Sequence, residues 1–293
     1  MLIVKANAKI NLTLDVLGTR EDGFHEVAMI MQTVGLHDTL YLSKTDGEIK
    51  LAHRIPYLPR DARNLAWKAA KLMIDRFSLD GGVHIRLEKH IPVAAGLAGG
   101  SADAAAVLKG MNILYKLHLS REELCRLGAE LGSDIPFCLQ GGTMLATGRG
   151  ECLERLPEMP DCYVVLAKPP FSVSTPWAYA EYDKLQEVHH PDNRAMEQAI
   201  AGKDLRQIAG LMGNVLENVT LAKYTELEDY KKIMLEHGAL ASMMSGSGPT
   251  VFCLVENRPT ALKIANALRK KTRAHIYVTR TWAGRRSGYH GKK

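Results

Sequence analysis

A glycine-rich segment at residues 91–108, IPVAAGLAGGSADAAAVL, constrains the fold of this chain more than any other feature. An alternating apolar run at 83–87 precedes it and predicts a β-strand. Pro92 ends that pattern, and three glycines then permit backbone angles that other residues avoid. These are Gly96, Gly99 and Gly100. From Ser101 the apolar residues take helical spacing, at Ala104, Val107, Leu108 and Met111. The segment therefore predicts a strand, a loop and the start of a helix.

The loop and the helix together predict an anion-binding site. The first turn of a helix has backbone N–H groups without partners inside the helix, and the helix dipole favours negative charge there. A glycine-rich loop that runs into such a helix is therefore suited to a phosphate group. A tight turn before a closely packed helix would give the same pattern without a ligand, so spacing alone leaves both interpretations open. The segment matches neither the Walker pattern nor GxGxxG.

Composition indicates an ordinary globular protein. The 293 residues are 46% apolar and 24% charged, enough for one large domain or two ordinary ones. No apolar run approaches the roughly 18 residues of a membrane span, and the first residues lack a secretory signal, so we expect no membrane association. Five cysteines without a CxxC pair predict a reduced, cytoplasmic setting.

The formal net charge of +6 would permit nucleic-acid binding, but Lys and Arg residues are scattered along the chain. They cluster only near the end, at Arg285, Arg286, Lys292 and Lys293. We interpret residues 285–293 as a frayed basic tail and predict no nucleic-acid partner. Anionic small substrates account for the charge equally well. The sequence leaves the oligomeric state open, a homo-oligomer included.

The order of the predicted elements indicates an α+β fold without internal repeats. In the first half we expect strands at 2–18, 24–34, 83–89 and within 140–150, and helices at 62–77, from 101 onward and at 121–131. In the second half we expect strands at 163–170, 239–244, 250–255 and 275–281, and helices at 176–187, 193–200, 204–212, 226–237 and 259–271. Pro157 and Pro160 precede the first strand of the second half, and we place the domains at 1–157 and 158–293.

Two polar residues stand out in this pattern. Residue parity along the first strand directs Ala8, Ile10, Leu12 and Leu14 toward a core, which leaves Lys9 and Asn11 on the opposite face. A lysine on such a face is commonly solvated. Asp134 follows a helix that ends at Gly132, and with Pro136 close behind it could simply cap the next helix. Taken singly, neither residue requires a catalytic role.

Four segments of the chain carry a resemblance to a known family. They are AKINLTLDVLGTREDGFHEV, the glycine loop at 92–102, LGSDIPFCLQGGTMLATGRGE and MMSGSGPTVFCLV. The loop resembles that of the GHMP kinases, and the four segments in this order resemble the 4-diphosphocytidyl-2-C-methyl-D-erythritol kinase family of the non-mevalonate isoprenoid pathway. The resemblance spans roughly residues 3 to 282 and implies a two-domain fold. Its N-terminal domain would be ribosomal-protein-S5-domain-2-like and its C-terminal domain ferredoxin-like.

The resemblance implies phosphoryl transfer from ATP, with Mg²⁺, to the 2-hydroxyl of a small-molecule alcohol. It assigns catalysis to Lys9 and Asp134, and cofactor binding to the loop. The loop residues are Pro92, Val93, Ala94, Ala95, Gly96, Leu97, Ala98, Gly99, Gly100, Ser101 and Ala102. The Ser101 hydroxyl is expected to contact phosphate or Mg²⁺. The family often has a second serine where this chain has Ala102, which removes one hydroxyl from the loop. Other metal ligands are not predicted.

The resemblance also implies a site for the cytidine diphosphate end of the substrate. Phe24 and Tyr179 are expected to stack on the cytosine ring, and His25 to read its edge. The remaining substrate residues are Asn11, Thr175, Ser245 and Gly246. Packing alone would also explain Phe24, and capping would explain the helix start beside Tyr179.

Two other functions are compatible with parts of the sequence. A GHMP kinase for homoserine or a mevalonate-type alcohol would share the glycine loop and the SGSG segment, but it would not need the Phe24–His25 pair. A non-catalytic ligand- or RNA-binding protein would be expected to lose Lys9 or Asp134, or to gather arginines and exposed aromatic residues. Neither feature is present in the sequence.

Overall fold

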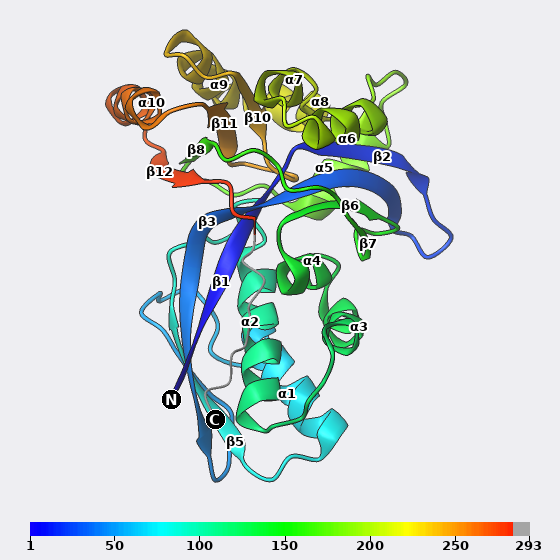
Figure 1. Cartoon of the computed structure of the whole chain (residues 1–293), viewed down its shortest axis with the longest axis vertical. Coiled ribbons are helices and arrows are strands. Elements are labelled where there is room, and N and C mark those ends of the chain that lie inside the picture. Colours follow the sequence, from blue (N-terminus) through cyan, green and yellow to red (C-terminus); the bar gives the residue numbers. More distant parts are fainter. Residues whose placement is uncertain (284–293) are drawn as a thin grey trace.

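The computed structural model describes residues 1–283, and the predicted basic tail at 285–293 lies outside this range. Within the described residues the strands form an eight-stranded and a four-stranded sheet. Figure 1 shows an elongated molecule in which helices α1–α4 lie beside the lower part of the larger sheet and the smaller sheet lies above. In the described part of the chain, no helix is both long and apolar enough to cross a membrane.

One long strand, β3, organises the larger sheet. It runs from His25 to Thr45 and pairs antiparallel with β1, β2, β5 and β6. The bounds of its partners are β1 Leu2–Asn11, β2 Thr13–Thr19, β5 Gly82–Glu88 and β6 Thr143–Thr147. The sheet is completed by β4 Lys50–Ala52, β7 Cys152–Arg155 and β9 Gly213–Asn214. We predicted that this strand ends near residue 34, and Gly35, His37 and Asp38 do interrupt the apolar alternation after that point. Pairing on both edges extends it to Thr45.

The helix after the glycine loop lies at the centre of the N-terminal half. It is α2, Gly99–Leu114, and its predicted inner face is buried completely, at Ala104, Val107, Leu108 and Met111. Alanines on its other sides let it pack closely against α1 (Leu65–Phe77) and β1. Helix α3, Arg121–Leu131, begins with a capping box in which Ser120 and Glu123 bond each other's backbone N–H groups.

A short helix was missed in this half. Helix α4, Ile135–Gln140, lies before the strand and turn predicted at 140–150, in a segment where only the capping interpretation of Asp134 implied a helix. It is six residues long, too short to show helical periodicity in sequence. The strand expected there begins at Thr143 as β6. The predicted first strand also divides at Leu12, where the Thr13 hydroxyl accepts the N–H of Ile30 at 2.9 Å.

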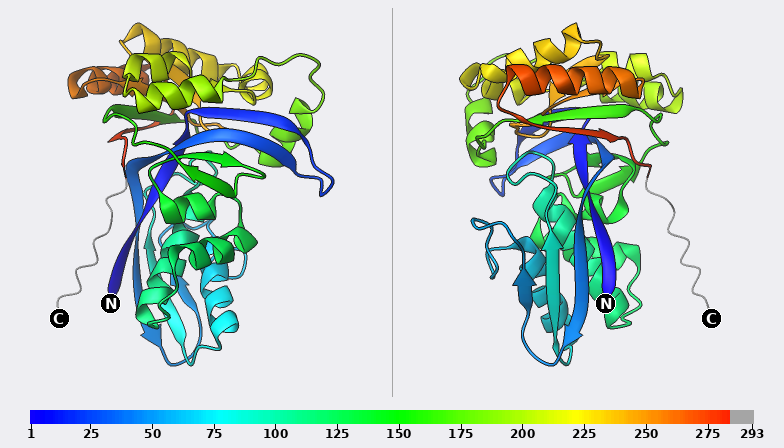
Figure 2. Two further views of the ribbon diagram at one scale, coloured as in Figure 1. Left: turned by 45° about the vertical axis from the view of Figure 1, so that its right-hand side comes forward. Right: turned by 90° about the vertical axis from the view of Figure 1, so that its left-hand side faces the viewer.

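The second half contains the four-stranded sheet, in the order β10-β11-β8-β12. Its strands are β8 Tyr163–Lys168, β10 Ala241–Met244, β11 Val251–Val255 and β12 His275–Arg280. Its helices are α5 Thr175–Tyr182, α6 Asn193–Ala201, α7 Leu205–Gly210, α8 Glu217–Lys223, α9 Glu226–Glu236 and α10 Arg258–Lys271. Figure 2 shows α9 and α10 above this sheet. Helix α5 ends five residues before the predicted 187, and β7, β9 and α8 were not predicted.

The two halves share their apolar cores. Ile10 of β1 belongs to the same buried cluster as Leu166 of β8, while Leu14 and Met31 join a second cluster with Val251 of β11. Strand β9 also crosses over, because it pairs parallel with β2. The division between residues 157 and 158 therefore stays a prediction, although the four-stranded sheet begins just after it.

Candidate active site

One cavity of about 980 Å³ brings together most of the predicted site residues. Those that line it are Lys9, Asn11, Phe24, His25, Asp134, Thr175, Tyr179, Gly246 and the loop residues Pro92–Gly96 and Ala98–Ser101. Three predicted residues are not among the lining residues. Leu97 and Ala102 are buried in the apolar core, and Ser245 is buried with its hydroxyl donating to the Gly96 carbonyl at 3.0 Å.

The glycine loop presents the open end of α2 to this cavity. Ala98 is the N-cap residue, with a left-handed backbone (φ +55°), and its side chain makes no capping hydrogen bond. The first N–H groups of the helix are therefore left for a ligand. The loop is fixed from the strand side by the N–H of Lys9, which donates to the Leu97 carbonyl at 3.2 Å.

Gly96 is required where the two halves of the chain meet. Its φ is +73°, and a Cβ there would lie 2.1 Å from the Ser245 carbonyl oxygen. The SGSG segment therefore approaches the glycine loop more closely than any side chain allows. This contact places Gly246 and Ser247 in the cavity wall beside the loop.

Lys9 and Asp134 meet in the same cavity. Lys9 Nζ lies 4.0 Å from Asp134 Oδ2 and donates to Asn11 Oδ1 at 2.7 Å. The Lys9 side chain is only 5% exposed, so it is not the solvated lysine that its strand position also allowed. Asp134 occupies the N-cap position of α4, but its side chain makes no capping bond and is 32% exposed. Capping therefore does not explain the carboxylate, which remains available to a ligand.

Aromatic residues form another part of the cavity. The rings of His25 and Tyr179 lie 4.6 Å apart, and His25 Nε2 is 2.7 Å from Asp183 Oδ1. Burial, and then the charge of Asp134, raises the pKa of Tyr179 to about 12, which keeps its phenol protonated. Phe24 is 53% exposed, and its ring lies 5.1 Å from the guanidinium of Arg149. The structure thus pairs Tyr179 with His25 and Phe24 with Arg149.

Several cavity residues were missed by sequence reasoning. They include Lys89, Asp103, Arg149, Asp183 and Ser247. Arg149 is held in a turn, where Glu151 accepts its backbone N–H at 2.7 Å. Ser247 is bonded to Thr175 through their hydroxyls at 2.8 Å. Arg149 lies in the quoted segment TGRGE and Ser247 in SGSG, so the sequence carried a signal near these two. It carried none for Lys89, Asp103 or Asp183.

Family models match both halves of the chain. The model described as the GHMP kinases N terminal domain covers residues 64–142, and the one described as GHMP kinases C terminal covers residues 196–274. A 4-diphosphocytidyl-2-C-methyl-D-erythritol kinase of Brevibacillus brevis is 52% identical over 267 residues, 91% of each chain. The Listeria monocytogenes serotype 4a enzyme of that name is 50% identical over 96% of each chain. The chain belongs to this kinase family.

A solved structure extends the match to three dimensions. A 4-(cytidine 5'-diphospho)-2C-methyl-D-erythritol kinase superposes with a TM-score of 0.82 at 33% identity, over 97% of this chain and 100% of that one. The expected GHMP kinase fold is thereby confirmed. As a kinase of this family, the chain uses a nucleoside triphosphate as phosphoryl donor, which fits the open helix end and the glycine loop.

The described residues do not build a dedicated metal cage. Within residues 1–283, no group of three or more His, Cys, Asp or Glu side chains is placed to hold a metal ion. The oxygen donors facing the cavity include the Asp134 carboxylate and the Ser101 hydroxyl. Such a set suits Mg²⁺ carried by a nucleotide, because that ion commonly keeps several waters and phosphate oxygens as ligands.

Proposed function

We propose that the chain transfers the γ-phosphoryl group of ATP to the 2-hydroxyl of 4-diphosphocytidyl-2-C-methyl-D-erythritol, in isoprenoid precursor synthesis. The observation that carries the proposal is a single cavity shared by an open helix end, the Lys9–Asp134 pair and the His25–Tyr179 pair. Family membership supports the same substrate, since the relatives at about half identity bear that name.

The donor would bind along the glycine loop. Backbone N–H groups at the start of α2 would hold the phosphates, and the helix dipole would favour their charge. Ser101, in the first turn, would donate its hydroxyl to a phosphate oxygen or contribute it to Mg²⁺. Bound Mg²⁺ would offset the charge that develops on the transferred group. The nucleoside would then lie against the lining residues that the acceptor does not use, Leu58, Pro59, Arg63, Asn64 and Leu65.

The acceptor hydroxyl would be oriented by Asp134. The oxygen of this hydroxyl would form the new bond to the γ-phosphorus while the bond from that phosphorus to the ADP oxygen breaks. The hydroxyl proton passes to the Asp134 carboxylate, and the other product is ADP. Lys9 would stabilise the negative charge on the transferring group, and Asn11 would hold the Lys9 ammonium in place through its 2.7 Å hydrogen bond.

The cytidine end would lie among the aromatic residues. Tyr179 and Phe24 offer ring faces to a base, and stacking accepts any base. Selectivity must therefore come from hydrogen bonds to the pyrimidine edge. His25 suits that role, because Asp183 fixes its ring through Nε2 and leaves Nδ1 for the ligand.

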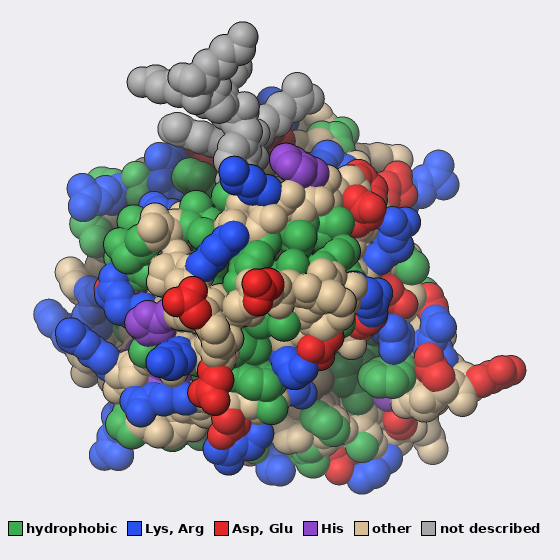
Figure 3. Space-filling model, turned by 90° about the horizontal axis from the view of Figure 1, so that it is seen from below, with side chains coloured by type: hydrophobic (Ala, Val, Ile, Leu, Met, Phe, Trp, Pro, Cys, Tyr) green, Lys and Arg blue, Asp and Glu red, His purple; other side chains and the backbone are tan. Residues whose placement is uncertain are grey.

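We further propose that the chain acts in the cytoplasm on small molecules only. All five cysteines are free, which fits a reducing compartment. Figure 3, which views the molecule from below, shows Lys and Arg side chains interspersed with Asp and Glu on that face. A mixed surface of this kind lacks the single-signed field by which proteins attract nucleic acid.

A coupled ADP-release assay tests the proposed function. We expect ATP- and Mg²⁺-dependent turnover of 4-diphosphocytidyl-2-C-methyl-D-erythritol and little turnover of homoserine or mevalonate. Comparable turnover of homoserine would show a different GHMP kinase. Tight binding of the cytidine substrate without ADP release would instead indicate a non-catalytic binder.

A further inference from the structure

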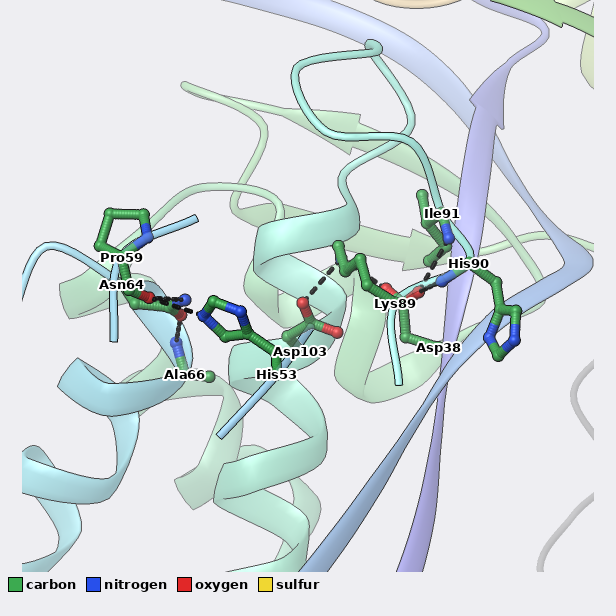
Figure 4. Close-up of polar contacts among 9 residues, drawn as sticks. All are labelled: Asp38, His53, Pro59, Asn64, Ala66, Lys89, His90, Ile91 and Asp103. Carbon is green, nitrogen blue, oxygen red and sulfur yellow. Dashed lines mark hydrogen bonds and ion pairs between the residues drawn. The ribbon is translucent and has the colours of Figure 1, made fainter. Parts of the chain in front are cut away.

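Three buried charged residues lie directly beneath the glycine loop. Lys89 Nζ bonds Asp38 Oδ2 at 2.5 Å and Asp103 Oδ2 at 2.7 Å. The side chains are 4%, 0% and 4% exposed, respectively. Figure 4 shows the Lys89 side chain between Asp103 on α2 and Asp38 on β3. We call Lys89, Asp38 and Asp103 the base cluster.

The base cluster is attached to both ends of the loop. On the entry side, Asp38 Oδ1 accepts the backbone N–H groups of His90 and Ile91, at 2.5 and 2.8 Å. On the exit side, a Cβ at Gly99 would lie 3.0 Å from Lys89 Nζ, so the first residue of α2 rests on the ammonium group. Asp103, one turn further along α2, completes the bridge. The segment 92–98 is therefore closed at its base by one set of ionic bonds.

The loop conformation needs such support. Ala94 and Ala98 have φ values of +50° and +55°, in the left-handed region that alanine rarely adopts. Residues in that region persist only where the surrounding structure determines their conformation. Inside the loop, the carbonyls of Gly96 and Leu97 are bonded, and the base cluster secures the residues on either side.

The charge balance argues against direct phosphate binding by Lys89. Burial opposes its charge, but Asp103 and Asp38 together raise the pKa of Lys89. Burial and the charge of Asp38 raise the pKa of Asp103 well above its usual range, although Lys89 opposes that shift. Whichever state Asp103 adopts, Asp38 alone can balance the ammonium. Lys89 therefore offers no surplus positive charge to an anion in the cavity.

Stability does not explain Asp103 either. Asp103 is one of the cavity-lining residues, and its Oδ1 is buried without a hydrogen-bond partner within the described residues. A buried carboxylate oxygen without a partner weakens a fold. What Asp103 does make is its 2.7 Å bond to Lys89 at the start of the loop helix.

We propose that Lys89 is a positioning residue: it bridges Asp38 and Asp103, joins the two ends of the phosphate loop, and does not itself bind phosphate. The proposal rests on the nucleotide site described under the proposed function. It predicts that removal of Lys89 and removal of Asp103 both weaken nucleotide binding. A lysine that bound phosphate would behave differently, because removal of Asp103 would release it toward the ligand.

Calorimetric titration of the full chain with MgADP separates these possibilities. The variants are Asp103→Asn, which keeps the size of the side chain and is expected to fold, Lys89→Met, and the double variant. Arg76→Met serves as control, since it breaks the Arg76–Glu130 ion pair between α1 and α3, away from the cavity. Thermal unfolding of each variant shows that the folded chain is being titrated.

We expect Asp103→Asn and Lys89→Met each to raise the MgADP dissociation constant, by about 10- to 100-fold for the larger effect. The dissociation constant of the double variant should not exceed that of the single variant that binds MgADP less tightly, because the two substitutions break the same bridge. The KM for ATP should rise while the KM for the cytidine substrate stays nearly constant, a split that a general loss of stability would not produce.

Tighter MgADP binding by Asp103→Asn would overturn the proposal, because it would reveal Lys89 as a phosphate ligand held back by Asp103. Parental affinity in Asp103→Asn would overturn it as well, by leaving the base cluster a purely structural role. A parent chain that binds no MgADP overturns the proposed function and this inference with it. If the parent chain binds MgADP and the variants bind it equally well, the inference is wrong while the proposed function stands.

Discussion

Lys9 Nζ and Asp134 Oδ2 lie 4.0 Å apart in the wall of the large cavity, although β1 carries one residue and the turn before α4 the other. Lys9 is buried and bonded to Asn11, whereas Asp134 makes no capping bond and is partly open to the cavity. A positive and a negative group are thus placed together where a phosphoryl group and a hydroxyl could meet. This arrangement makes the pair the first target for mutation.

Asp134→Asn should lower kcat by about 10²- to 10⁴-fold, because it removes the proton acceptor and its charge. Lys9→Met should have a similar effect, and the double variant should lose much less than the product of the single losses. Thermal stability should change little, because the Asp134 side chain caps nothing. Steady-state kinetics and thermal unfolding provide both measurements.

Ser120→Ala is the matched control for that experiment. Ser120 does cap a helix, since its hydroxyl accepts the N–H of Glu123 at the start of α3. Its loss should cost about 1 kcal/mol of stability and leave kcat unchanged. Near-parental kcat in Asp134→Asn would remove Asp134 from the mechanism.

Phe24→Ala and Tyr179→Ala should each raise the KM for the cytidine substrate and leave the KM for ATP nearly unchanged. Losing a base stack costs about 1–3 kcal/mol, or ~5- to 150-fold in affinity. Tyr57→Ala is the control, because Tyr57 is an exposed aromatic outside the cavity. If both cavity variants bind the substrate as the parent does, the aromatic residues have been given the wrong role.

Gly96→Ala should weaken nucleotide binding strongly, because its Cβ would lie 2.1 Å from the Ser245 carbonyl and push the SGSG segment off the loop. Gly238→Ala is the control, because it measures the stability lost when alanine occupies a positive-φ position without a close backbone contact. Gly238 also has a positive φ, +103°, but its Cβ would meet only a Thr260 methyl at 3.1 Å. We expect the control to lose stability alone. Calorimetry with MgADP compares the two, and equal affinities would show that the close approach does not shape the site.

Cysteine labelling tests the described burial. Burial raises the pKa of Cys138, Cys162 and Cys253 to about 12, so only about 10⁻⁴ of each is thiolate at pH 8. Cys152 is exposed. Iodoacetamide at pH 8 should therefore modify Cys152 long before these three, as read by peptide mass spectrometry. In urea all five should react. Early modification of Cys162 in the native chain would contradict the described packing.

Local sequence patterns were sufficient to predict the elements around the glycine loop. The change from alternating to helical spacing predicted β5, the loop and the buried face of α2, because each pattern spans neighbouring residues whose geometry is set by the backbone. Resemblance then determined the family and selected Lys9, Asp134 and His25. Helix α4 is too short to show its period, and Gly35, His37 and Asp38 interrupt the apolar alternation of β3 before Leu40 and Leu42 resume it.

Which of these residues come into contact depends on tertiary packing. The Lys9–Asp134 pair and the contact of His25 with Tyr179 each join segments far apart in the chain. Lys89 shows the limit most clearly: in sequence it is a charged residue at the end of a strand, and only packing places it between Asp38 and Asp103. Local patterns record what a residue's neighbours along the chain require. Ion pairs, close approaches and cavities depend on distances that folding alone creates.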